Sequence, residues 1–437
     1  MSDTTRAAGF VLRLRADAIP ARAVEVAQSA ILDGLACAIA GRDEPVAVRL
    51  RGWARAQAGS GAATLWGSGE RVPAGLAALV NGAAAHALDF DDVSWAMNGH
   101  PTVPLLPAAL AAAEVANASG AELLRAFVAG FEIEARIGQM LGRPHYERGW
   151  HATATAGVFG AAAAAGLLLG LDAGQLRRAF GIAASRASGT RANFGTDTKP
   201  LHAGLAARAG LEAAELAKLG VTAREDALEA EMGLADLYGA GRPALPRLGE
   251  PFALERPGLE LKPYPSCRFT HRAIDAVLAL REKHGESSLR AIEIASDPLG
   301  LKILIYPTPS TGLEAKFSLQ YCAAVAWLDG WPGLDSFSDA RAARGDVQDL
   351  LRRVTVREAR GPDEEVELVF RDGTRARETA RVARGNPERP LSEAERLAKV
   401  RGCIAPKLGE ARAERLIESV GRLESLADIR ELIACLA

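Results

Sequence analysis

The sequence predicts a mainly α fold, in which a large all-helical bundle domain carries a smaller, lid-like α+β domain. Alanine and leucine recur at helical spacing from about residue 20 to residue 220, between short loops rich in Gly, Pro, Asp and Asn. After Lys262, short segments with the alternation of strands replace that pattern. A chain of 437 residues also exceeds the length at which one hydrophobic core keeps growing, so we expect two domains.

The helical domain is expected to span residues 1–262 and to be completed by residues 385–437, because helical texture returns after Gly385-Asn386-Pro387. In that tail, Ser392 and Glu395 have the spacing of a capping box. Several predicted helices are apolar on most faces, so they must lie inside a bundle or at an oligomer interface. The predicted helices of this domain are 21–40, 72–88, 104–118, 122–141, 152–169, 172–187 with Asp172 as its cap, and 200–219.

Residues 263–384 are expected to form the smaller α+β domain. Short strands are predicted at 291–294, 302–306 and 354–358, and a hairpin is predicted in 365–374. The hairpin carries Asp372-Gly373, a strong signal for a two-residue turn. Helices at 271–284 and 317–328 would pack with these strands.

Charge and composition exclude several classes of protein. With 52 basic and 54 acidic residues the net charge is −2, which gives no electrostatic footprint for nucleic acid or an anionic membrane. The first residues lack a secretory signal pattern, and the most apolar stretch, 156–171, is shorter than the roughly 20 residues of a membrane span. Five cysteines without CxxC spacing indicate neither a fully paired disulfide framework nor a zinc site. We expect a cytoplasmic protein.

The most unusual segment runs from His86 through Pro101, between two apolar helices. It contains the acidic run Asp89-Phe90-Asp91-Asp92 and, further on, His100 directly before a proline that suits a helix start. Helix capping and a surface histidine are the ordinary explanation. A catalytic or binding loop is the functional one.

Two further segments combine polar groups with the start of an apolar helix. His151 stands with two threonines at the start of the apolar helix 152–169, and Lys199 precedes a helix that begins with proline. Capping and a solvated surface lysine are the ordinary alternatives. Backbone N–H groups at a helix start, together with an ammonium, make a site for a carboxylate. Together, these loops suggest an anion-binding pocket.

A fourth cluster lies at the change of texture between the domains, where ligand sites are common. Here Lys262 and Arg268 are candidates to bind carboxylates, while Cys267 or His271 is a candidate proton carrier. A proline-rich hinge before an ordinary helix is the alternative. The segment 316–321 is weaker, since it also reads as a helix with core aromatic residues.

Two cofactor patterns are rejected. Gly59-Ser-Gly61 lacks the third glycine and the strand–turn–helix context of a dinucleotide site, and the chain has no Walker A motif. The carboxylates of 89–92 suggest Mg²⁺, but several oxygen ligands must converge on that ion and the DFDD spacing is not DDxxD. We expect neither a metal nor a cofactor.

Taken together, these motifs resemble the MmgE/PrpD family in the same order along nearly the whole chain. The family includes 2-methylcitrate dehydratase, cis-aconitate decarboxylase and iminodisuccinate epimerase. The resemblance implies a large helical domain, a smaller α+β domain and a homodimer. The motifs that carry it are NGAAAHALDFDD, GHPTVPLLPAALAAAE, GWHATATAGVFGAAAAAGLLLGL, GTDTKPLHAGLAA, LKPYPSCRFTHRAIDA and EAKFSLQYCAAVA.

The resemblance also implies an active site, whose residues by motif are Asp89, His100, His151, Lys199, Lys262 and Tyr321, and His271 matches a pattern common in the family. The decarboxylase branch has histidine where Cys267 stands and threonine where Val93 stands, which weakens that assignment.

These family activities share a carbanion-like centre next to a carboxylate. The lysines Lys199 and Lys262 would offset the charge there, while one of His151 and His100 takes the proton and the other, or Asp89, acts as the acid. We expect dehydration of a small 2-methylcitrate-like polycarboxylate. An epimerase, a decarboxylase and a non-catalytic anion-binding protein are the alternatives.

Overall fold

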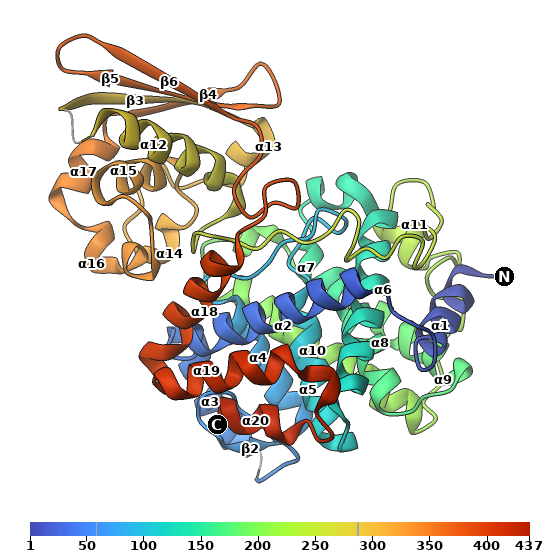
Figure 1. Ribbon diagram of the computed structural model, residues 1–437. Helices are drawn as coiled ribbons and strands as arrows, with labels where there is room; N and C mark the ends of the chain where they lie inside the picture. The colour runs from blue at the N-terminus through green and yellow to red at the C-terminus, as the bar shows by residue number, and fades with distance from the viewer. Residues whose placement is uncertain (58, 286–287) are drawn as a thin grey trace.

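The computed structural model describes residues 1–57, 59–285 and 288–437. Its buried apolar side chains form two separate cores. One core takes residues between Ala7 and Leu259 and between Val400 and Leu436, and the other takes residues between Tyr264 and Phe370 together with Phe194. Figure 1 shows the two cores as a large helical domain and a smaller α+β domain at one end of it. The fold class predicted from the sequence is confirmed.

The helical domain is built almost entirely from helices, with one short antiparallel ribbon of β1 (Ala63–Thr64) and β2 (Arg71–Val72). Its helices are α1 (Asp3–Arg13), α2 (Ala21–Gly41), α3 (Pro45–Gln57), α4 (Ala74–His86), α5 (Thr102–Ala116), α6 (Gly120–Glu147), α7 (Ala152–Thr155), α8 (Gly157–Leu168), α9 (Ala173–Ala184), η1 (Arg191–Asn193), α10 (Thr198–Lys218), α11 (Leu234–Tyr238), α18 (Glu393–Leu408), α19 (Glu410–Gly421), η4 (Leu423–Ser425) and α20 (Arg430–Leu436).

Local signals set the ends of these helices. Asp172 caps α9 and Ser392 caps α18, each in a capping box, as the sequence predicts. The predicted helix 122–141 ends where expected, because Gly142 leaves the helical conformation with φ 66°. The predicted helix 152–169 is divided at Ala156 into α7 and α8.

A close helix crossing positions the site. Helices α4 and α10 pack so tightly that a Cβ atom on Gly82 or Gly204 would collide with the backbone of the facing helix. Glycine permits this approach because it has no side chain. The crossing brings His86, at the end of α4, to the start of α10, where Lys199 lies.

The α+β domain has a four-stranded sheet in the order β4-β3-β5-β6. Strand β3 (Leu289–Ser296) pairs in parallel with β4 (Val354–Glu358) and antiparallel with β5 (Glu364–Phe370), and β5 pairs antiparallel with β6 (Arg375–Ala380). Figure 1 shows the helices on one side of this sheet. The helices of this domain are η2 (Arg268–Thr270), α12 (His271–His284), α13 (Pro298–Leu301), α14 (Gly312–Ala315), α15 (Leu319–Asp329), η3 (Leu334–Phe337), α16 (Asp339–Ala342) and α17 (Gly345–Leu351).

Two local predictions for this domain need correction. The predicted strand 302–306 is wrong, because the amide groups of Ile303 and Leu304 bond back to the carbonyl of Gly300 while both side chains enter the core. That apolar run serves packing rather than sheet pairing. The predicted hairpin forms, but residues 371–374 connect its strands in place of the predicted two-residue turn. In this connection Asp372 accepts hydrogen bonds from the backbone N–H and the hydroxyl of Thr374.

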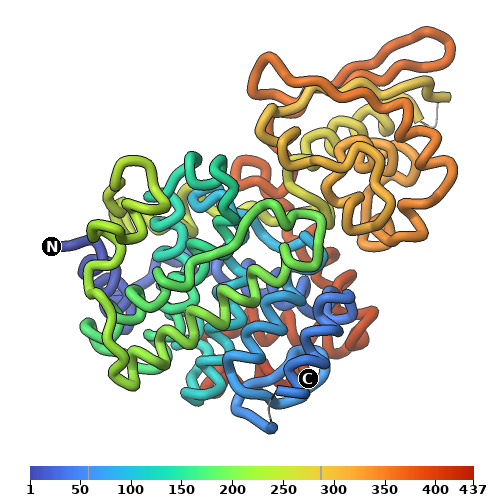
Figure 2. Tube along the Cα trace, turned by 180° about the vertical axis from the view of Figure 1, so that it is seen from behind, coloured from blue at the N-terminus to red at the C-terminus, as the bar shows by residue number. Residues whose placement is uncertain are grey.

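The tail returns to the helical domain. Helix α18 packs on α2 and on α19, and Figure 2 shows the tail in red beside the attachment of the α+β domain. Within the described residues, only α2 is long and apolar enough to span a membrane by length and composition. Because 67% of its apolar window is buried inside the protein, we describe α2 as a core helix.

Glu134 of α6 places a carboxyl group inside the helical core. Its carboxyl is fully buried, and neither oxygen has a hydrogen-bond partner among the residues that the structure describes. Burial, reinforced by Asp92, raises the pKa of Glu134 well above 4.5. Above pH 4.5 the carboxyl is ionised in the unfolded chain but still protonated in the folded protein. The protein therefore loses about 1.4 kcal/mol of stability for each pH unit between 4.5 and the raised pKa of the folded state.

We therefore expect Glu134→Gln to stabilise the protein relative to wild type more at pH 8 than at pH 5. Urea unfolding of both proteins at the two pH values measures this difference. A stability difference that does not change with pH would contradict the buried, protonated carboxyl.

Candidate active site

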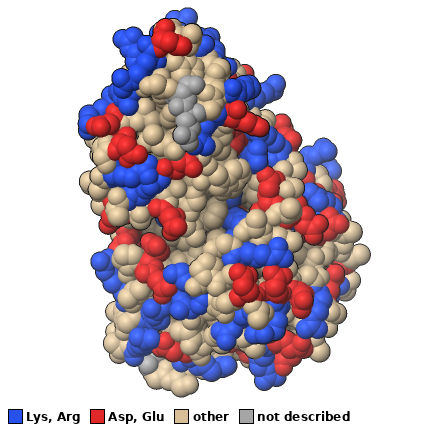
Figure 3. All heavy atoms as spheres, turned by 60° about the vertical axis from the view of Figure 1, so that its left-hand side comes forward, with Lys and Arg blue, Asp and Glu red and all other residues tan. Residues whose placement is uncertain are grey.

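A cavity of about 260 Å³ lies where the two domains meet. Figure 3 shows one face of the molecule, with charges of both signs interspersed and a hollow between the domains. The four segments singled out in the sequence converge at this cavity, as a common anion-binding pocket requires. The predicted site residues that line the cavity are Asp89, His100, His151, Lys199, Lys262, Cys267 and Arg268.

Asp89 is the centre of the site. Its Oδ1 lies 2.9 Å from the Nζ atoms of both Lys199 and Lys262, and all three side chains are buried. Burial alone would raise the pKa of the Asp89 carboxyl, but the two ammonium groups outweigh it and hold that pKa well below 3.8. An ionised Asp89 cannot donate a proton, which argues against the acid role suggested from the sequence.

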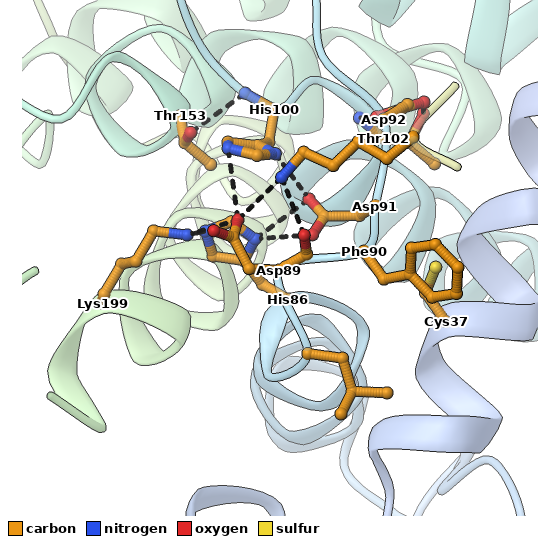
Figure 4. A network of polar contacts seen from close by, with 12 residues as sticks. Cys37, His86, Asp89, Phe90, Asp91, Asp92, His100, Thr102, Thr153 and Lys199 are labelled. Atoms are coloured by element: carbon orange, nitrogen blue, oxygen red, sulfur yellow. Dashed lines mark hydrogen bonds and ion pairs between the residues drawn. The ribbon is translucent and has the colours of Figure 1, made fainter. Parts of the chain in front are cut away.

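His86 connects Lys199 to Asp91 (Figure 4). Its Nε2 lies 2.9 Å from Lys199 Nζ, and its Nδ1 lies 2.9 and 3.0 Å from the two oxygens of Asp91. An ammonium only donates, so Nε2 accepts and the ring proton lies on Nδ1. Burial is the main reason that the pKa of His86 falls to about 3. His86 is therefore neutral, and both nitrogens are already used.

Asp91 also contacts His100. The Nδ1 of His100 lies 2.9 Å from Asp91 Oδ2 without the geometry of a hydrogen bond, and its Nε2 lies 3.7 Å from Asp89 Oδ1. We assign the ring proton to Nδ1, which faces the nearer carboxylate, and this leaves Nε2 as the basic nitrogen. Burial, together with the nearby Lys262 and Lys199, lowers the pKa of His100 although Asp91 opposes the shift. Figure 4 shows the two imidazoles and the two carboxylates facing one another.

Residues from the start of α7 complete this wall. Thr153 Oγ1 accepts a hydrogen bond from the backbone N–H of His100 at 3.0 Å. The Nδ1 atoms of His151 and His202 are 3.1 Å apart, so one of the two donates and the other accepts. Burial lowers the pKa of His151 well below 6.5, with a further contribution from Lys199. The cavity thus contains neutral imidazoles.

The segment between the domains supplies the opposite wall. Arg268 stacks on the rings of Trp95 and Phe269, and its buried Nε has no partner among the residues of the described chain. Burial lowers the pKa of this guanidinium and raises the pKa of the Cys267 thiol. Cys267 is therefore protonated at neutral pH, while Arg268 offers an unsatisfied cationic donor to a carboxylate.

Two predicted site residues do not line this cavity. His271 Nε2 lies 3.1 Å from the carbonyl oxygen of Ser266, and its ring contacts Tyr264. The Tyr321 hydroxyl donates to the carbonyl of Ser336, and its ring is fully buried in the core of the α+β domain. The helical geometry of α15 turns Tyr321 into that core.

Sequence reasoning missed His86, Asp91 and His202 as site residues. His86 and Asp91 lie in the segment already singled out, but their spacing does not reveal that one carboxylate would serve two histidines. His202 follows Lys199 by three residues, so a shared helix face was the available signal. Its partner, His151, comes from a distant part of the chain.

The same groups also resemble a metal site. Ligand atoms of His86, Asp89, Asp91 and His100 lie within 4.8 Å of one another. However, the ammonium groups of Lys199 and Lys262 donate directly to Asp89, and Lys199 also donates to the basic nitrogen of His86. A cation would compete with both lysines, so the arrangement favours an anionic ligand.

Comparison with known proteins shows the family of this chain. Residues 5–245 match the MmgE/PrpD N-terminal domain, and residues 264–425 match the MmgE/PrpD C-terminal domain. The chain belongs to the MmgE/PrpD family. The second match covers both the α+β domain and part of the tail, which packs on the helical domain.

Curated relatives of this MmgE/PrpD protein are enzymes that carry the name cis-aconitate decarboxylase. The chain is 31% identical to the Mus musculus enzyme over 98% of its own length and 92% of the relative. It is 31% identical to the Homo sapiens enzyme, over 95% and 90% of the two chains. The Aspergillus terreus enzyme is 28% identical, over 97% and 94%.

The cationic wall predicts stabilisation by a small polycarboxylate. We expect tricarballylate to raise the melting temperature of the wild-type protein, since a ligand at 100 times its Kd adds about 2.7 kcal/mol of stability. In Lys199→Met this rise should be much smaller, whereas the control Lys218→Met, at the exposed end of the same helix, should behave as wild type. Thermal denaturation with and without ligand measures the effect. An equal rise in all three proteins would contradict the site.

Proposed function

We propose that this protein is a lyase that removes water from a small hydroxy polycarboxylate of the 2-methylcitrate type. The observation that carries the proposal is a neutral His100 in the cavity wall, whose Nδ1 faces Asp91 at 2.9 Å, beside the ammonium groups of Lys199 and Lys262. Dehydration next to a carboxylate begins with removal of a proton, which requires an unprotonated base.

The lysines have donors left for substrate. Lys199 uses its ammonium on His86 and Asp89, and Lys262 uses its own on the carbonyl and the carboxylate of Asp89. An ammonium has three N–H donors, so each lysine retains one for a substrate carboxylate. On the opposite wall Arg268 binds a second carboxylate. This spacing of cations supports a substrate with more than one carboxylate.

In the proposed reaction, His100 Nε2 takes the proton from the carbon next to a carboxylate. Lys199 and Lys262 offset the charge that develops on that carboxylate. The electron pair of the broken C–H bond forms a carbon–carbon double bond, and the hydroxyl on the neighbouring carbon leaves. The imidazolium that has formed on His100 then gives this proton to the leaving hydroxyl, which departs as water.

Decarboxylation is the second candidate. The names of the curated relatives favour it, since they match this chain over nearly its whole length. It breaks a carbon–carbon bond instead, and the carbanion then needs a proton from an acid. The neutral imidazoles of the free site fit a base better than that acid, and Cys267 and Val93 depart from the decarboxylase pattern.

The remaining expectations belong to the same proposal. We propose that the enzyme acts without a metal or cofactor, in the cytoplasm and as a homodimer. Exposed apolar side chains on one helix, Leu205, Leu216 and the adjoining Leu219 of α10, offer surface for such an assembly.

Proton NMR in D₂O tests the reaction. The purified, EDTA-treated protein is mixed with 2-methylcitrate, citrate, cis-aconitate or iminodisuccinate, and the same panel is given to His100→Gln and to the control Lys218→Met. We expect loss of water from 2-methylcitrate or citrate, at least about 100-fold slower in His100→Gln and unchanged in the control. Release of CO₂ from cis-aconitate would favour the second candidate, and deuterium incorporation alone would indicate an epimerase. If no compound reacts or exchanges, the protein is not a lyase for this class.

The pH dependence follows from the same base. Because His100 works when unprotonated and its pKa is lowered below 6.5, kcat/KM should stay constant from pH 8 down to pH 6.5 and fall only at lower pH. Initial rates at low substrate concentration over pH 4.5 to 8 measure this profile. An acid limb centred above pH 6.5 would contradict a lowered His100 pKa.

A further inference from the structure

The backbone of the Asp89 loop is held in an unusual way. The consecutive carbonyl oxygens of Leu88, Asp89 and Phe90 each accept a hydrogen bond from the ammonium of a different lysine, at 3.0, 2.8 and 2.8 Å. The donors are Lys316, Lys262 and Lys399, in that order. They come from the α+β domain, the interdomain segment and the tail helix α18. We call this set the lysine clamp.

The conformation of Asp89 explains why its carbonyl neighbours need support. Asp89 has φ 52°, in the left-handed region that residues with a side chain rarely adopt. Such a conformation costs free energy and persists only where surrounding contacts fix it. In this conformation the carboxylate meets Lys199 and Lys262, so the backbone geometry and the ion pairs depend on each other.

Two of the clamp lysines approach from outside the candidate active site. Lys316 and Lys399 line a second and larger interdomain cavity, of about 1430 Å³, which Leu88 and Phe90 also line. Asp89, between them in the sequence, lines the smaller cavity. The segment 88–90 is therefore a thin wall between the two cavities, with the lysines on one side and the proposed chemistry on the other.

Lys399 is the more firmly held of the two. Its Nζ lies 2.6 Å from Asp33 Oδ1 of α2 and 4.0 Å from the centre of the Phe90 ring, and its side chain is 5% exposed. Despite burial, Asp33 and the nearby Cys37 raise the pKa of Lys399, so it remains an ammonium. Burying an ammonium without hydrogen-bond acceptors is costly, and the Phe90 carbonyl is one of the acceptors that Lys399 has.

Lys316 joins the two domains at the same loop. It follows α14 in the α+β domain, and its hydrogen bond to the Leu88 carbonyl crosses to the helical domain. Burial lowers the pKa of Lys316 to about 8, with Asp89 among the groups that oppose the shift. The small domain thus contacts the backbone next to Asp89 through a lysine that does not itself line the site.

We infer that Lys399 and Lys316 are positioning residues, which hold Asp89 in its left-handed conformation from behind and so align Lys199 and Lys262 for substrate. This inference rests on the proposed function for its effect on turnover. Its structural part, the restraint of segment 88–90, does not depend on which reaction the protein catalyses.

The test uses the full-length protein and removes Lys399 from the clamp without leaving a buried charge. In the double variant Asp33→Leu/Lys399→Met both members of the ion pair become apolar, an exchange that folded proteins tolerate. The single variant Lys399→Arg retains a cation that can donate to Asp33 and Phe90. The control is Lys407→Met, later in α18, where the lysine pairs with Asp43 at the surface.

Three measurements are made on each protein: the melting temperature, amide hydrogen exchange of the segment 86–93, and kcat and KM on whichever compound of the panel the wild type converts. For the double variant we expect an unchanged melting temperature, faster exchange in 86–93 and a roughly 100-fold lower kcat, the scale of a small misplacement of a catalytic group. Lys399→Arg should recover most of the kcat, and Lys407→Met should match wild type.

The outcomes separate the two proposals. Wild-type exchange and kcat in the double variant would overturn the clamp. Equal losses in Lys407→Met would also overturn it, because they would indicate a general effect of α18. If the wild type converts no compound, the proposed function fails, and the exchange of 86–93 alone then decides whether the clamp restrains the loop.

Discussion

Burying two ammonium groups beside one carboxylate is the constraint on which the rest of this site depends. Lys199 and Lys262 both donate to Asp89 Oδ1, and neither can be buried at acceptable cost without that acceptor. To present its carboxylate, Asp89 takes a left-handed backbone conformation. The close crossing of α4 and α10 at Gly82 and Gly204 brings these elements together. The ion pairs of the site therefore depend on how closely the helices of the core pack.

That surplus of positive charge also sets the protonation of the histidines. Together with burial, the lysines lower the pKa values of His86, His100 and His151, so the free cavity holds neutral imidazoles in a cationic setting. An anionic substrate would balance the charge of the lysines, and the unprotonated His100 could accept a proton from the carbon next to a substrate carboxylate. The same balance explains why a cluster of histidine and aspartate favours a polycarboxylate over a metal ion.

The sequence predicts the helical elements well, because alanine-rich helices with caps such as Asp172 and Ser392 are determined locally. The strand prediction fails at 302–306, where apolar residues pack in the core without pairing with another strand. Tertiary contacts decide between a strand and an irregular core segment, and the local sequence does not contain them. Asp89, His100, His151 and Lys199 were found because polar residues in apolar surroundings stand out. The tautomer of His86 and the position of Tyr321 depend on partners distant in sequence, such as Lys199 and Ser336.

The most direct test of this account is the protonation of the site histidines, measured by nitrogen NMR of the protein with ¹⁵N-labelled histidine at pH 7. His86→Gln and His100→Gln assign the two signals. We expect both rings to be neutral, with the proton on Nδ1 and a basic Nε2. An imidazolium signal for His100, or a proton on its Nε2 in the free protein, would contradict the proposed base and with it the role of Asp91.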